Sequence, residues 1–294
     1  MLESALASPI PPTAVAPDAR PLISVVVPVK NEEGNVAPLI AEIAAALDAA
    51  EAQDPTLTYE IVYVDDGSTD TTPTILANLR GAYPNLRQLR HATSGGQSAA
   101  IRSGVRAARG SFIATLDGDG QNNPAFIPQM IQILKAGVIA QPGGDTQAAN
   151  TSSTGNTSWP DLASVDAFRV GIVQGQRVGR KDTPFKRWQS RQANRIRGAI
   201  LQDGTRDTGC GLKAFPRAVY LALPYFDAIH RFMPALVKRE GLQVAHLDVV
   251  DRPRHSGVSN YGFWGRLWVG VLDLVGVWWL IRRKKPTPDV KEIV

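Results

Sequence analysis

The sequence predicts an α/β fold with a mostly parallel sheet, and three observations lead to it. Residues 23–27 are rich in β-branched side chains and suit a strand buried on both faces. Similar apolar runs alternate along the chain with segments of helix-forming composition, in the order β-α-β-α. Two of these runs, 61–64 and 112–116, end in acidic turns. Because the carboxyl ends of parallel strands meet at one edge of a sheet, we expect both turns to lie together where ligands bind.

The chain begins with two strand–helix pairs. After the strand at 23–27, the turn at 28–33 leads into an Ala-rich helix over about 35–52. The second apolar strand, 61–64, is followed by its acidic turn and then by a helix over 72–83.

Two further pairs continue the alternation. Residues 86–90 are expected to form a strand, and the Gly-Gly turn within 94–98 leads into a helix over about 99–108. The strand at 112–116 follows, and then a helix over 124–135. This alternation predicts a doubly wound sheet.

The second half of the chain is less regular. Residues 137–163 are rich in Gly, Asn, Ser, Thr and Gln and are expected to form a mobile insertion. A strand is expected at 170–174, and the basic segment 177–197 is expected to be partly helical. Residues 207–215 are expected to form a Gly-rich turn before a helix, and 244–250 the last strand.

One globular domain is expected over residues 22–255, since the chain has 294 residues, of which 44% are hydrophobic and 20% charged. Residues 1–21 are rich in Pro and Ala and lack the basic start and apolar centre of a signal peptide, so a disordered tail is expected. Residues 256–294 are expected to form a membrane-associated helix and a basic tail.

The apolar segment 263–281 contains four Trp and would extend roughly 28 Å as a helix. Arg266 and Asp273 would each cost about 2 to 3.5 kcal/mol at the centre of a bilayer. The basic run 282–285 follows directly and suits anionic headgroups. These features favour a helix lying in the membrane interface over a spanning helix. A packed core helix with a solvated basic end is the alternative.

Charge is distributed unevenly along the chain. Residues 1–150 hold 9 Lys and Arg against 15 Asp and Glu, whereas residues 151–294 hold 23 against 12. This asymmetry suits an acidic, metal-binding half and a basic half that faces phosphates or an anionic surface. Nucleic acid is disfavoured as a partner because no zinc finger or RNA-recognition aromatic motif is found. The single cysteine, Cys210, excludes an internal disulfide and fits a reducing compartment.

Asp117 and Asp119 form the most informative motif, an Asp-x-Asp turn directly after an apolar strand. Carboxylates are hard oxygen ligands, so this turn suggests Mg²⁺ or Mn²⁺ holding a diphosphate. An isolated Asp-x-Asp is more commonly a solvated turn. The second acidic turn, Asp65 to Asp70, favours the metal site because it follows another strand of the same sheet.

Five pieces in this order resemble the GT-A glycosyltransferases of family 2, especially the dolichol-phosphate and polyprenyl-phosphate mannosyl- and glucosyltransferases. The pieces are Val25 to Glu33, Val64 to Asp70, Leu116 to Gln121, Asp207 to Phe215, and His230-Arg231-Phe232. The resemblance covers about residues 22–254. It implies a Rossmann-like GT-A domain with a mostly parallel mixed sheet.

The resemblance also implies site residues for the donor. Pro28, Asn31, Glu32 and Asp66 would line the nucleotide pocket, with Asp66 near the base or ribose. Asp117, Asp119 and Gln121 match an Asp-x-Asp-x-Gln motif and would lie at the metal and the diphosphate. The donor would be a nucleotide diphosphate sugar, and Asp119 would assist the leaving diphosphate.

The expected acceptor is a lipid phosphate. Relatives with sugar-hydroxyl acceptors need a carboxylate base, often in a Glu-Asp pair, and no such pair occurs near 226–234. A phosphate monoester is already an anion at neutral pH. By resemblance, Arg177 and Arg191 would contact this phosphate, and Arg252 or Arg254 would add a further contact. His230 has no visible partner and is expected to hold a structural hydrogen bond.

These features predict an inverting, metal-dependent transferase that moves one hexose to polyprenyl phosphate at the cytoplasmic face of a membrane, as a peripheral or monotopic protein. Inversion follows from the resemblance alone. The processive signature Gln-x-x-Arg-Trp is missing at Arg187-Trp188, which favours single-sugar transfer. Two alternatives stay open: a transferase acting on a soluble glycan or small molecule, and an inactive nucleotide-sugar-binding scaffold.

Overall fold

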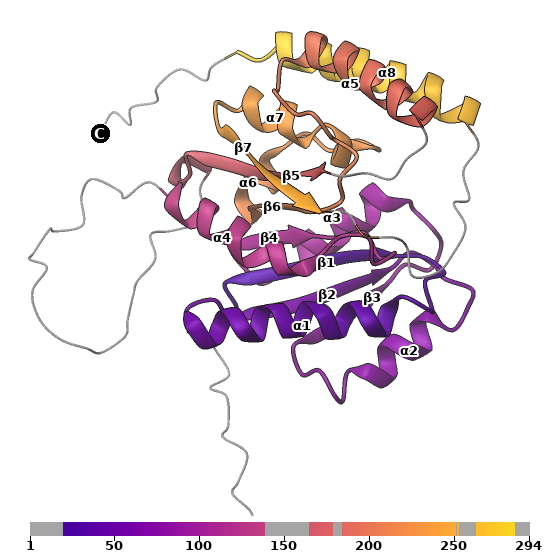
Figure 1. Cartoon of the computed structure of the whole chain (residues 1–294), viewed down its shortest axis with the longest axis vertical. Helices are drawn as coiled ribbons and strands as arrows, with labels where there is room; N and C mark the ends of the chain where they lie inside the picture. The colour runs from indigo at the N-terminus through magenta and orange to yellow at the C-terminus, as the bar shows by residue number, and fades with distance from the viewer. Residues whose placement is uncertain (1–19, 139–164, 179–183, 251, 253–262, 286–294) are drawn as a thin grey trace, which may run out of the picture.

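Seven strands form one sheet in the order β3-β2-β1-β4-β6-β5-β7 (Figure 1). The strands are β1 (Ile23–Val29), β2 (Tyr59–Asp65), β3 (Leu86–Arg90), β4 (Phe112–Thr115), β5 (Val170–Val178), β6 (Lys213–Pro216) and β7 (Gln243–Val250). Neighbouring strands run parallel except at β6, which is antiparallel to both β4 and β5. The predicted α/β fold with a mostly parallel mixed sheet is confirmed.

The computed structural model describes residues 20–138, 165–178, 184–250, 252 and 263–285. The expected tail therefore lies outside the described residues up to residue 19, and so does almost all of the expected insertion at 137–163. Residues 256–262 and 286–294 also lie outside them.

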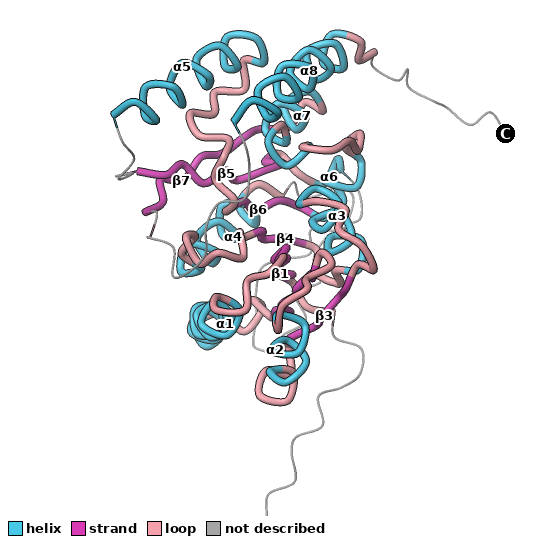
Figure 2. The backbone as a smooth tube through the Cα atoms, turned by 90° about the vertical axis from the view of Figure 1, so that its right-hand side faces the viewer, coloured by secondary structure: helices cyan, strands magenta, loops and turns pink. Residues whose placement is uncertain are grey.

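Helices cover both faces of the sheet (Figure 2). The α-helices are α1 (Val36–Gln53), α2 (Thr72–Leu79), α3 (Gln97–Ala107), α4 (Ile127–Ala136), α5 (Pro184–Leu201), α6 (Arg217–Ala222), α7 (Met233–Arg239) and α8 (Phe263–Arg282). Short 3₁₀ turns are η1 (Pro124–Phe126), η2 (Val165–Ala167) and η3 (Ile229–Arg231). Helix α1 contacts α4 on one face, and α3 contacts α6 on the other.

The chain reverses its direction of travel across the sheet between β1 and β4. Strands β1, β2 and β3 are laid down outward in sequence order, and α3 then returns the chain so that β4 pairs with β1 on its other side. Ligands of open α/β sheets bind at such a switch point, beyond the carboxyl ends of the strands. The acidic turns that follow β2 and β4 both lie at this edge of the sheet.

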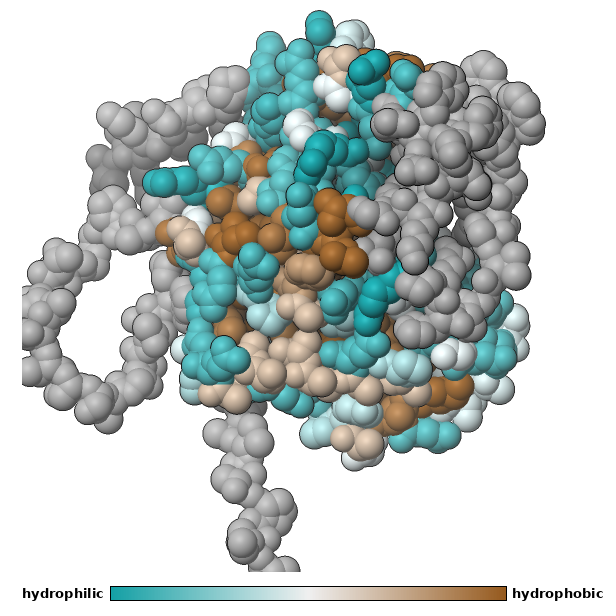
Figure 3. Space-filling model, in the orientation of Figure 1, coloured by the Kyte–Doolittle hydropathy of each residue, from teal (hydrophilic) through white to brown (hydrophobic). Residues whose placement is uncertain are grey.

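The central strands β1, β2 and β4 are almost wholly buried between the two helical layers. Every residue of β2 and β4 is buried, as is every residue of β1 except Pro28. Continuous apolar sequence in these strands therefore reflects burial on both faces. On the face seen in Figure 3, apolar residues gather in the middle of the molecule around α4, which packs against β5 and β6.

One expectation was wrong. Residues 207–215 were expected to form a Gly-rich turn, but 213–216 form strand β6, which pairs with both β4 and β5. The strand has only four residues and follows a Gly-rich segment, so turn composition hides it in the sequence. Its pairing on both sides completes the sheet, and this tertiary contact outweighs the local turn signal.

The C-terminal segment is helical, as expected, and packs on the rest of the domain. Helix α8 contacts α5 and α7. Val277 is buried, and Leu274 and Ile281 are partly buried against the core. Among the described residues, no helix combines the length and the apolar character needed to cross a bilayer.

Candidate active site

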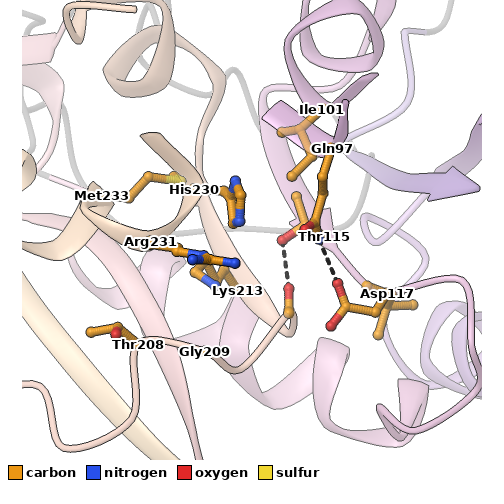
Figure 4. Close-up of a pocket in the computed structure, with 12 residues that line it drawn as sticks. Gln97, Ile101, Thr115, Asp117, Thr208, Gly209, Lys213, His230, Arg231 and Met233 are labelled. Carbon is orange, nitrogen blue, oxygen red and sulfur yellow. Dashed lines mark hydrogen bonds between the residues drawn. The ribbon is translucent and has the colours of Figure 1, made fainter. Parts of the chain in front are cut away.

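A pocket opens at the switch point, beyond the carboxyl end of β4 (Figure 4). The residues that line it are Gln97, Ile101, Thr115, Leu116, Asp117, Thr208, Gly209, Gly211, Lys213, His230, Arg231 and Met233. They come from α3, from the end of β4, from the segment leading into β6, and from η3 and α7. The site thus unites segments that lie more than a hundred residues apart in the sequence.

The Asp-x-Asp turn starts at Asp117 and is shaped by contacts close in sequence. The side chain of Asn122 accepts a hydrogen bond from the Asp117 amide at 3.0 Å, and Asp119 Oδ1 accepts one from the Gln121 amide at 3.1 Å. Gly118 is needed here because a Cβ atom would lie 2.4 Å from Val29 Cγ1. The turn is therefore seated directly on the end of β1.

The Asp117 carboxylate points into the pocket and accepts a hydrogen bond from Gln97 Nε2 at 2.8 Å (Figure 4). Burial, together with the nearby charge of Asp119, raises the pKa of Asp117. A Cβ on Gly211 would lie 2.2 Å from Asp117 Oδ2, so the Gly-rich segment before β6 fits tightly against this carboxylate.

The oxygen ligands of this turn fit a divalent cation whose remaining coordination positions are filled by substrate and water. No group of three or more His, Cys, Asp or Glu side chains that could hold a metal occurs among the described residues. Asp117 and Asp119 supply two carboxylates, and Mg²⁺ typically takes one or two carboxylates and fills its other positions with phosphate oxygens and water. Burial and then the charge of Asp119 raise the pKa of Asp117, and a bound cation would relieve this unfavourable setting.

Loops after β1 and β2 are joined by side-chain hydrogen bonds. Asn31 Oδ1 accepts from the Thr69 amide at 2.8 Å, and the Asn31 amide donates to Ser68 Oγ at 2.9 Å. The Glu32 amide donates to Thr72 Oγ1 at 3.0 Å. Asn31 and Glu32, expected in the nucleotide pocket, thus lie at the same edge of the sheet as the Asp-x-Asp turn.

Asp66 organises the loop between β3 and α3. Its carboxylate accepts hydrogen bonds from the amides of Gly95 and Gly96, both at 2.8 Å, from Ser94 Oγ at 2.7 Å, and from His91 Nδ1 at 2.7 Å. Burial opposes ionisation of this carboxyl, but the hydrogen bonds outweigh it and the pKa of Asp66 is lowered. Asp66 is therefore a fixed anion beside the start of α3.

Basic residues occupy the wall of the pocket opposite Asp117 (Figure 4). Lys213 is 3% exposed, and its amine donates to the carbonyl of Cys210. Arg231 comes from η3 and lies beside Lys213. Burial lowers the pKa of Lys213, while the charges of Asp117 and Asp207 oppose this shift.

His230 lies on the same wall and contacts α3. Its Nδ1 is 2.7 Å from Ser98 Oγ. Burial, followed by the charges of Lys213 and Arg231, lowers the pKa of His230 to about 3. His230 is thus neutral at pH 7 and makes the kind of hydrogen bond that the sequence led us to expect.

Arg177 lies on β5 in a paired geometry with Asp207. Its Nε donates to Asp207 Oδ2 at 2.6 Å and its Nη2 donates to Asp207 Oδ1 at 3.1 Å. A Cβ on the pocket residue Gly209 would lie 3.2 Å from Arg177 Nη2. Arg177 therefore lies directly behind the pocket wall, oriented by Asp207.

Comparison with known proteins agrees with this geometry. Residues 24–223 match Glycosyl transferase family 2. The chain belongs to this family. The expected resemblance is thereby confirmed, and the protein is a glycosyltransferase.

Similar sequences act on lipid phosphates according to their names. The dodecaprenyl-phosphate galacturonate synthase of Rhizobium johnstonii is 31% identical over 269 residues, covering 89% of this glycosyltransferase and 68% of that protein. The undecaprenyl-phosphate 4-deoxy-4-formamido-L-arabinose transferase of Shewanella sediminis is 29% identical over 243 residues. This match covers 82% of the present chain and 62% of that protein. The chain thus spans about two thirds of the length of these relatives.

Solved structures share the GT-A fold. Glucosyl-3-phosphoglycerate synthase from Mycobacterium tuberculosis, in complex with Mn²⁺ and UDP, superposes with a TM-score of 0.57 at 17% identity over 89% of this chain and 80% of that one. A mannosyltransferase from Pyrobaculum calidifontis, in complex with GDP-Man and Mn²⁺, superposes with a TM-score of 0.57 at 19% identity. The superposition covers 94% of this chain and 68% of that one. At these identities the likeness establishes the fold of the glycosyltransferase.

Of the three other expected arginines, Arg252 is described and does not line the pocket of the glycosyltransferase. Arg191 belongs to helix α5, but its side chain lies outside the described residues. Arg254 also lies outside them. The side chain of Arg252 donates to Glu42 and to the carbonyl of Asn122, next to the Asp-x-Asp turn.

Sequence reasoning missed two residues that contact Asp117 or face it across the pocket. Gln97 follows a Gly-Gly pair and begins α3, so only its place at a helix start marks it. Lys213 stands between Leu212 and Ala214-Phe215, and a single lysine in an apolar run is the available signal for a buried amine. Neither pattern by itself distinguishes a site residue from an ordinary polar residue. The pairing of β4 with β6, which the sequence does not show, is needed as well.

Proposed function

We propose that this glycosyltransferase moves one hexose, with inversion, from a nucleotide diphosphate sugar to a polyprenyl phosphate. The named activities of the relatives support the acceptor class, and the nucleotide and Mn²⁺ in the solved neighbours support the donor class. The observation that carries the proposal is the set of titratable groups in the pocket.

Among the described lining residues, no carboxylate outside the expected metal turn can serve as a general base, since Asp117 is the one acid of this lining. His230 has a pKa of about 3, so it accepts a proton poorly at pH 7. A hydroxyl acceptor would need such a base, whereas a phosphate monoester brings its own anion. The pocket chemistry therefore favours a phosphate acceptor.

In the proposed step, an acceptor phosphate oxygen attacks the anomeric carbon and forms the new C–O bond. The bond from that carbon to the β-phosphate oxygen breaks, and the nucleoside diphosphate leaves with the electron pair. Asp117 and Asp119 would hold Mg²⁺ or Mn²⁺, with Gln121 beside them. The bound cation would neutralise charge that develops on the leaving diphosphate.

Residues around the pocket would position the two substrates. Pro28, Asn31, Glu32 and Asp66 lie at or beside the ends of β1 and β2 and are proposed to form the nucleotide side. Arg177 is proposed to act on the acceptor phosphate, oriented by its fork with Asp207. Arg191 and Arg254 remain proposed acceptor contacts. Correct placement of the nucleophile supplies much of the rate in such reactions.

A membrane surface is the proposed location of the acceptor, and α8 is the proposed docking helix. Leu272, Val275 and Trp279 of α8 are 71%, 57% and 53% exposed. Exposed Ile196 and Ile200 belong to α5, which contacts α8. The exposed basic run 282–285 follows, and it suits an anionic lipid face. We propose a peripheral position on the cytoplasmic side.

The direct test is transfer of radiolabelled sugar from GDP-mannose, UDP-glucose and UDP-N-acetylglucosamine to polyprenyl phosphate in detergent with Mn²⁺. We expect lipid-extractable label from at least one donor. Asp119→Ala is expected to reduce the label by about 100-fold or more, because removal of a cation ligand weakens the charge stabilisation that the leaving group needs.

Two outcomes would contradict the proposal. Label in a soluble acceptor with none in the lipid would indicate a soluble-acceptor transferase. Donor binding without transfer to any acceptor would indicate an inactive scaffold.

A further inference from the structure

Among the described residues, Arg252 makes polar contacts with Glu42 and with the turn that carries the expected metal ligands. Its amide donates to the Gln121 carbonyl at 3.0 Å, and its own carbonyl accepts from Gln121 Nε2 at 3.4 Å. Its Nη2 donates to the Asn122 carbonyl at 3.2 Å. The contact with Glu42 is an ion pair of 2.5 Å between Nη2 and Glu42 Oε2. Arg252 thus joins the segment after β7 to the end of the Asp-x-Asp-x-Gln motif.

Glu42 fixes the far end of this arrangement. It belongs to α1, an 18-residue helix whose residues Leu39, Ile40 and Ile43 are buried in the core. A carboxylate on a packed helix is a rigid anchor, in contrast to a loop residue. The guanidinium of Arg252 therefore lies between a fixed helix and a turn that contains two glycines.

This geometry differs from that of an acceptor-phosphate ligand. Arg252 is not among the described residues that line the pocket. Its guanidinium already faces a carboxylate and a carbonyl, and a phosphate at the same nitrogen would have to compete with Glu42. The contacts are directed toward residues 121 and 122, which come two and three positions after Asp119.

We propose that Glu42 and Arg252 form a clamp that holds the 117–122 turn in its cation-binding geometry, so that Arg252 is a positioning residue and not an acceptor ligand. The inference rests on the proposed function in one respect, namely that this turn binds the metal–diphosphate group. Substitution of a residue that orients metal ligands without touching the metal commonly lowers the metal affinity by 10- to 100-fold. The clamp is such a set of outer contacts.

The clamp is expected to affect the turn more than the whole fold. The side chains of Arg252 and Glu42 are 30% and 34% exposed, and ion pairs at such exposure contribute little to global stability. Loss of the pair would therefore leave the domain folded but would let the glycine-containing turn sample other geometries.

The test measures Mn²⁺ binding by electron paramagnetic resonance, with GDP and separately with UDP present. Glu42→Gln keeps the shape of the side chain and removes its charge, and Arg252→Met removes the guanidinium. We expect each variant to weaken Mn²⁺ binding by about 10-fold, and the double variant to weaken it no further than the single ones. The charge-swapped pair Glu42→Arg with Arg252→Glu is expected to recover part of the loss.

Arg206→Met is the matched control. Arg206 forms an ion pair of the same length, 2.5 Å, with Asp248, but this pair is exposed and does not involve the turn. We expect Mn²⁺ binding by this variant to equal that of the wild-type protein. A thermal melt of each variant reports whether the fold is retained.

The results separate this inference from the proposed function. If Arg252→Met raises the KM for polyprenyl phosphate while Mn²⁺ binding is unchanged, and Glu42→Gln has no effect, Arg252 is an acceptor ligand and the clamp is wrong. If the wild-type protein binds no Mn²⁺ with either nucleotide, the metal-dependent function fails together with the clamp. Loss of Mn²⁺ binding in both variants supports the clamp whichever acceptor is used.

Discussion

Asp117 lies where contacts from three parts of the chain meet. Gln97 at the start of α3 donates to its carboxylate, Gly211 before β6 leaves no room behind it, and Asp119 adds a second negative charge. Each contact restricts where the carboxylate lies, and together they aim it into the pocket. A binding site for a small cation requires that the surrounding residues hold each ligating side chain precisely in place.

Gly211→Ala tests this restriction. The added Cβ would lie within 2.2 to 2.5 Å of the Asp117 carboxylate, which must move. Because a carboxylate moves more easily than backbone, the melting temperature should change little, whereas sugar transfer should fall by at least about 10-fold. The control is Gly81→Ala, where a Cβ meets nothing within 4 Å. Full transfer activity in Gly211→Ala would show that Asp117 need not occupy its present position.

His230 predicts a specific pH dependence of stability. Its pKa is lowered to about 3 in the folded protein, first by burial and then by the charges of Lys213 and Arg231. The unfolded chain takes up this proton near pH 6.5 and the folded protein does not, so stability falls as the pH drops from about 6.5 towards 3. Between pH 7.5 and 5.5 the loss from this residue is about 1.4 kcal/mol.

Urea unfolding of the wild-type protein and of His230→Gln at both pH values measures this term. The difference between the two proteins isolates His230 from the other titrating groups. An equal pH dependence in both proteins would mean that His230 is protonated as readily in the folded state as in the unfolded one.

At the scale of elements, strands buried on both faces were predictable and strand β6 was not. The runs that became β1, β2 and β4 are mainly apolar, and burial favours this composition. Strand β6 is four residues long, contains Lys213, and gains its stability from pairing with β4 and β5. The pairing with β4 connects residues about a hundred positions apart and the pairing with β5 residues about forty apart, which local sequence does not reveal.

The residues of the candidate site likewise fall into those that the sequence predicts and those that depend on tertiary packing. Asp117 and Asp119 follow a predictable strand in a turn of distinctive composition, so the sequence identifies them. Gln97 and Lys213 acquire their role only because the start of α3 reaches the turn after β4 and because β6 pairs with β4. The resemblance placed Arg252 among acceptor contacts, whereas its contacts with Glu42 and Asn122 depend on how α1 packs.

Helix α8 gives a prediction for membrane binding. Its residues 274, 277 and 281 face the core, which leaves Leu272 and Trp279 exposed on another side. Replacing both with Ser should weaken binding to vesicles of phosphatidylcholine and phosphatidylglycerol by about 10-fold or more, because each side chain contributes on the order of 1 kcal/mol or more when it enters lipid.

Co-sedimentation with the vesicles measures this binding. Leu221→Ser is the control, since Leu221 is 38% exposed on α6 and belongs to neither α5 nor α8. Equal vesicle binding by the double variant and the control would contradict a docking role for α8. Raised salt should weaken binding by the wild-type protein because residues 282–285 are basic.

At the scale of the whole molecule, an acidic half and a basic half contribute opposite walls of one pocket. The net charge of residues 1–150 is −6 and that of residues 151–294 is +11. The first half supplies Asp117, and the second supplies Lys213 and Arg231. This division suits two substrates that meet at the switch point, one bound through a cation and the other through basic side chains.

This arrangement predicts cooperative binding of metal and nucleotide. Two carboxylates leave most positions of a divalent cation unfilled, so Mn²⁺ alone or a nucleoside diphosphate alone should raise the melting temperature only slightly. Both together should raise it by several degrees more than the sum of the separate shifts. Differential scanning fluorimetry with GDP and with UDP measures this. A full shift with Mn²⁺ alone would point to a complete metal site elsewhere.

The most direct test of the central claim compares two acceptors that differ only in the phosphate. Sugar transfer to a polyprenyl phosphate is measured beside transfer to the polyprenyl alcohol of the same chain length, with one active donor and Mn²⁺. Because the described pocket lining offers no carboxylate base outside the expected metal turn and His230 accepts a proton poorly, we predict lipid-linked product with the phosphate and none with the alcohol. Comparable transfer to the alcohol would contradict the claim that the acceptor supplies the attacking anion.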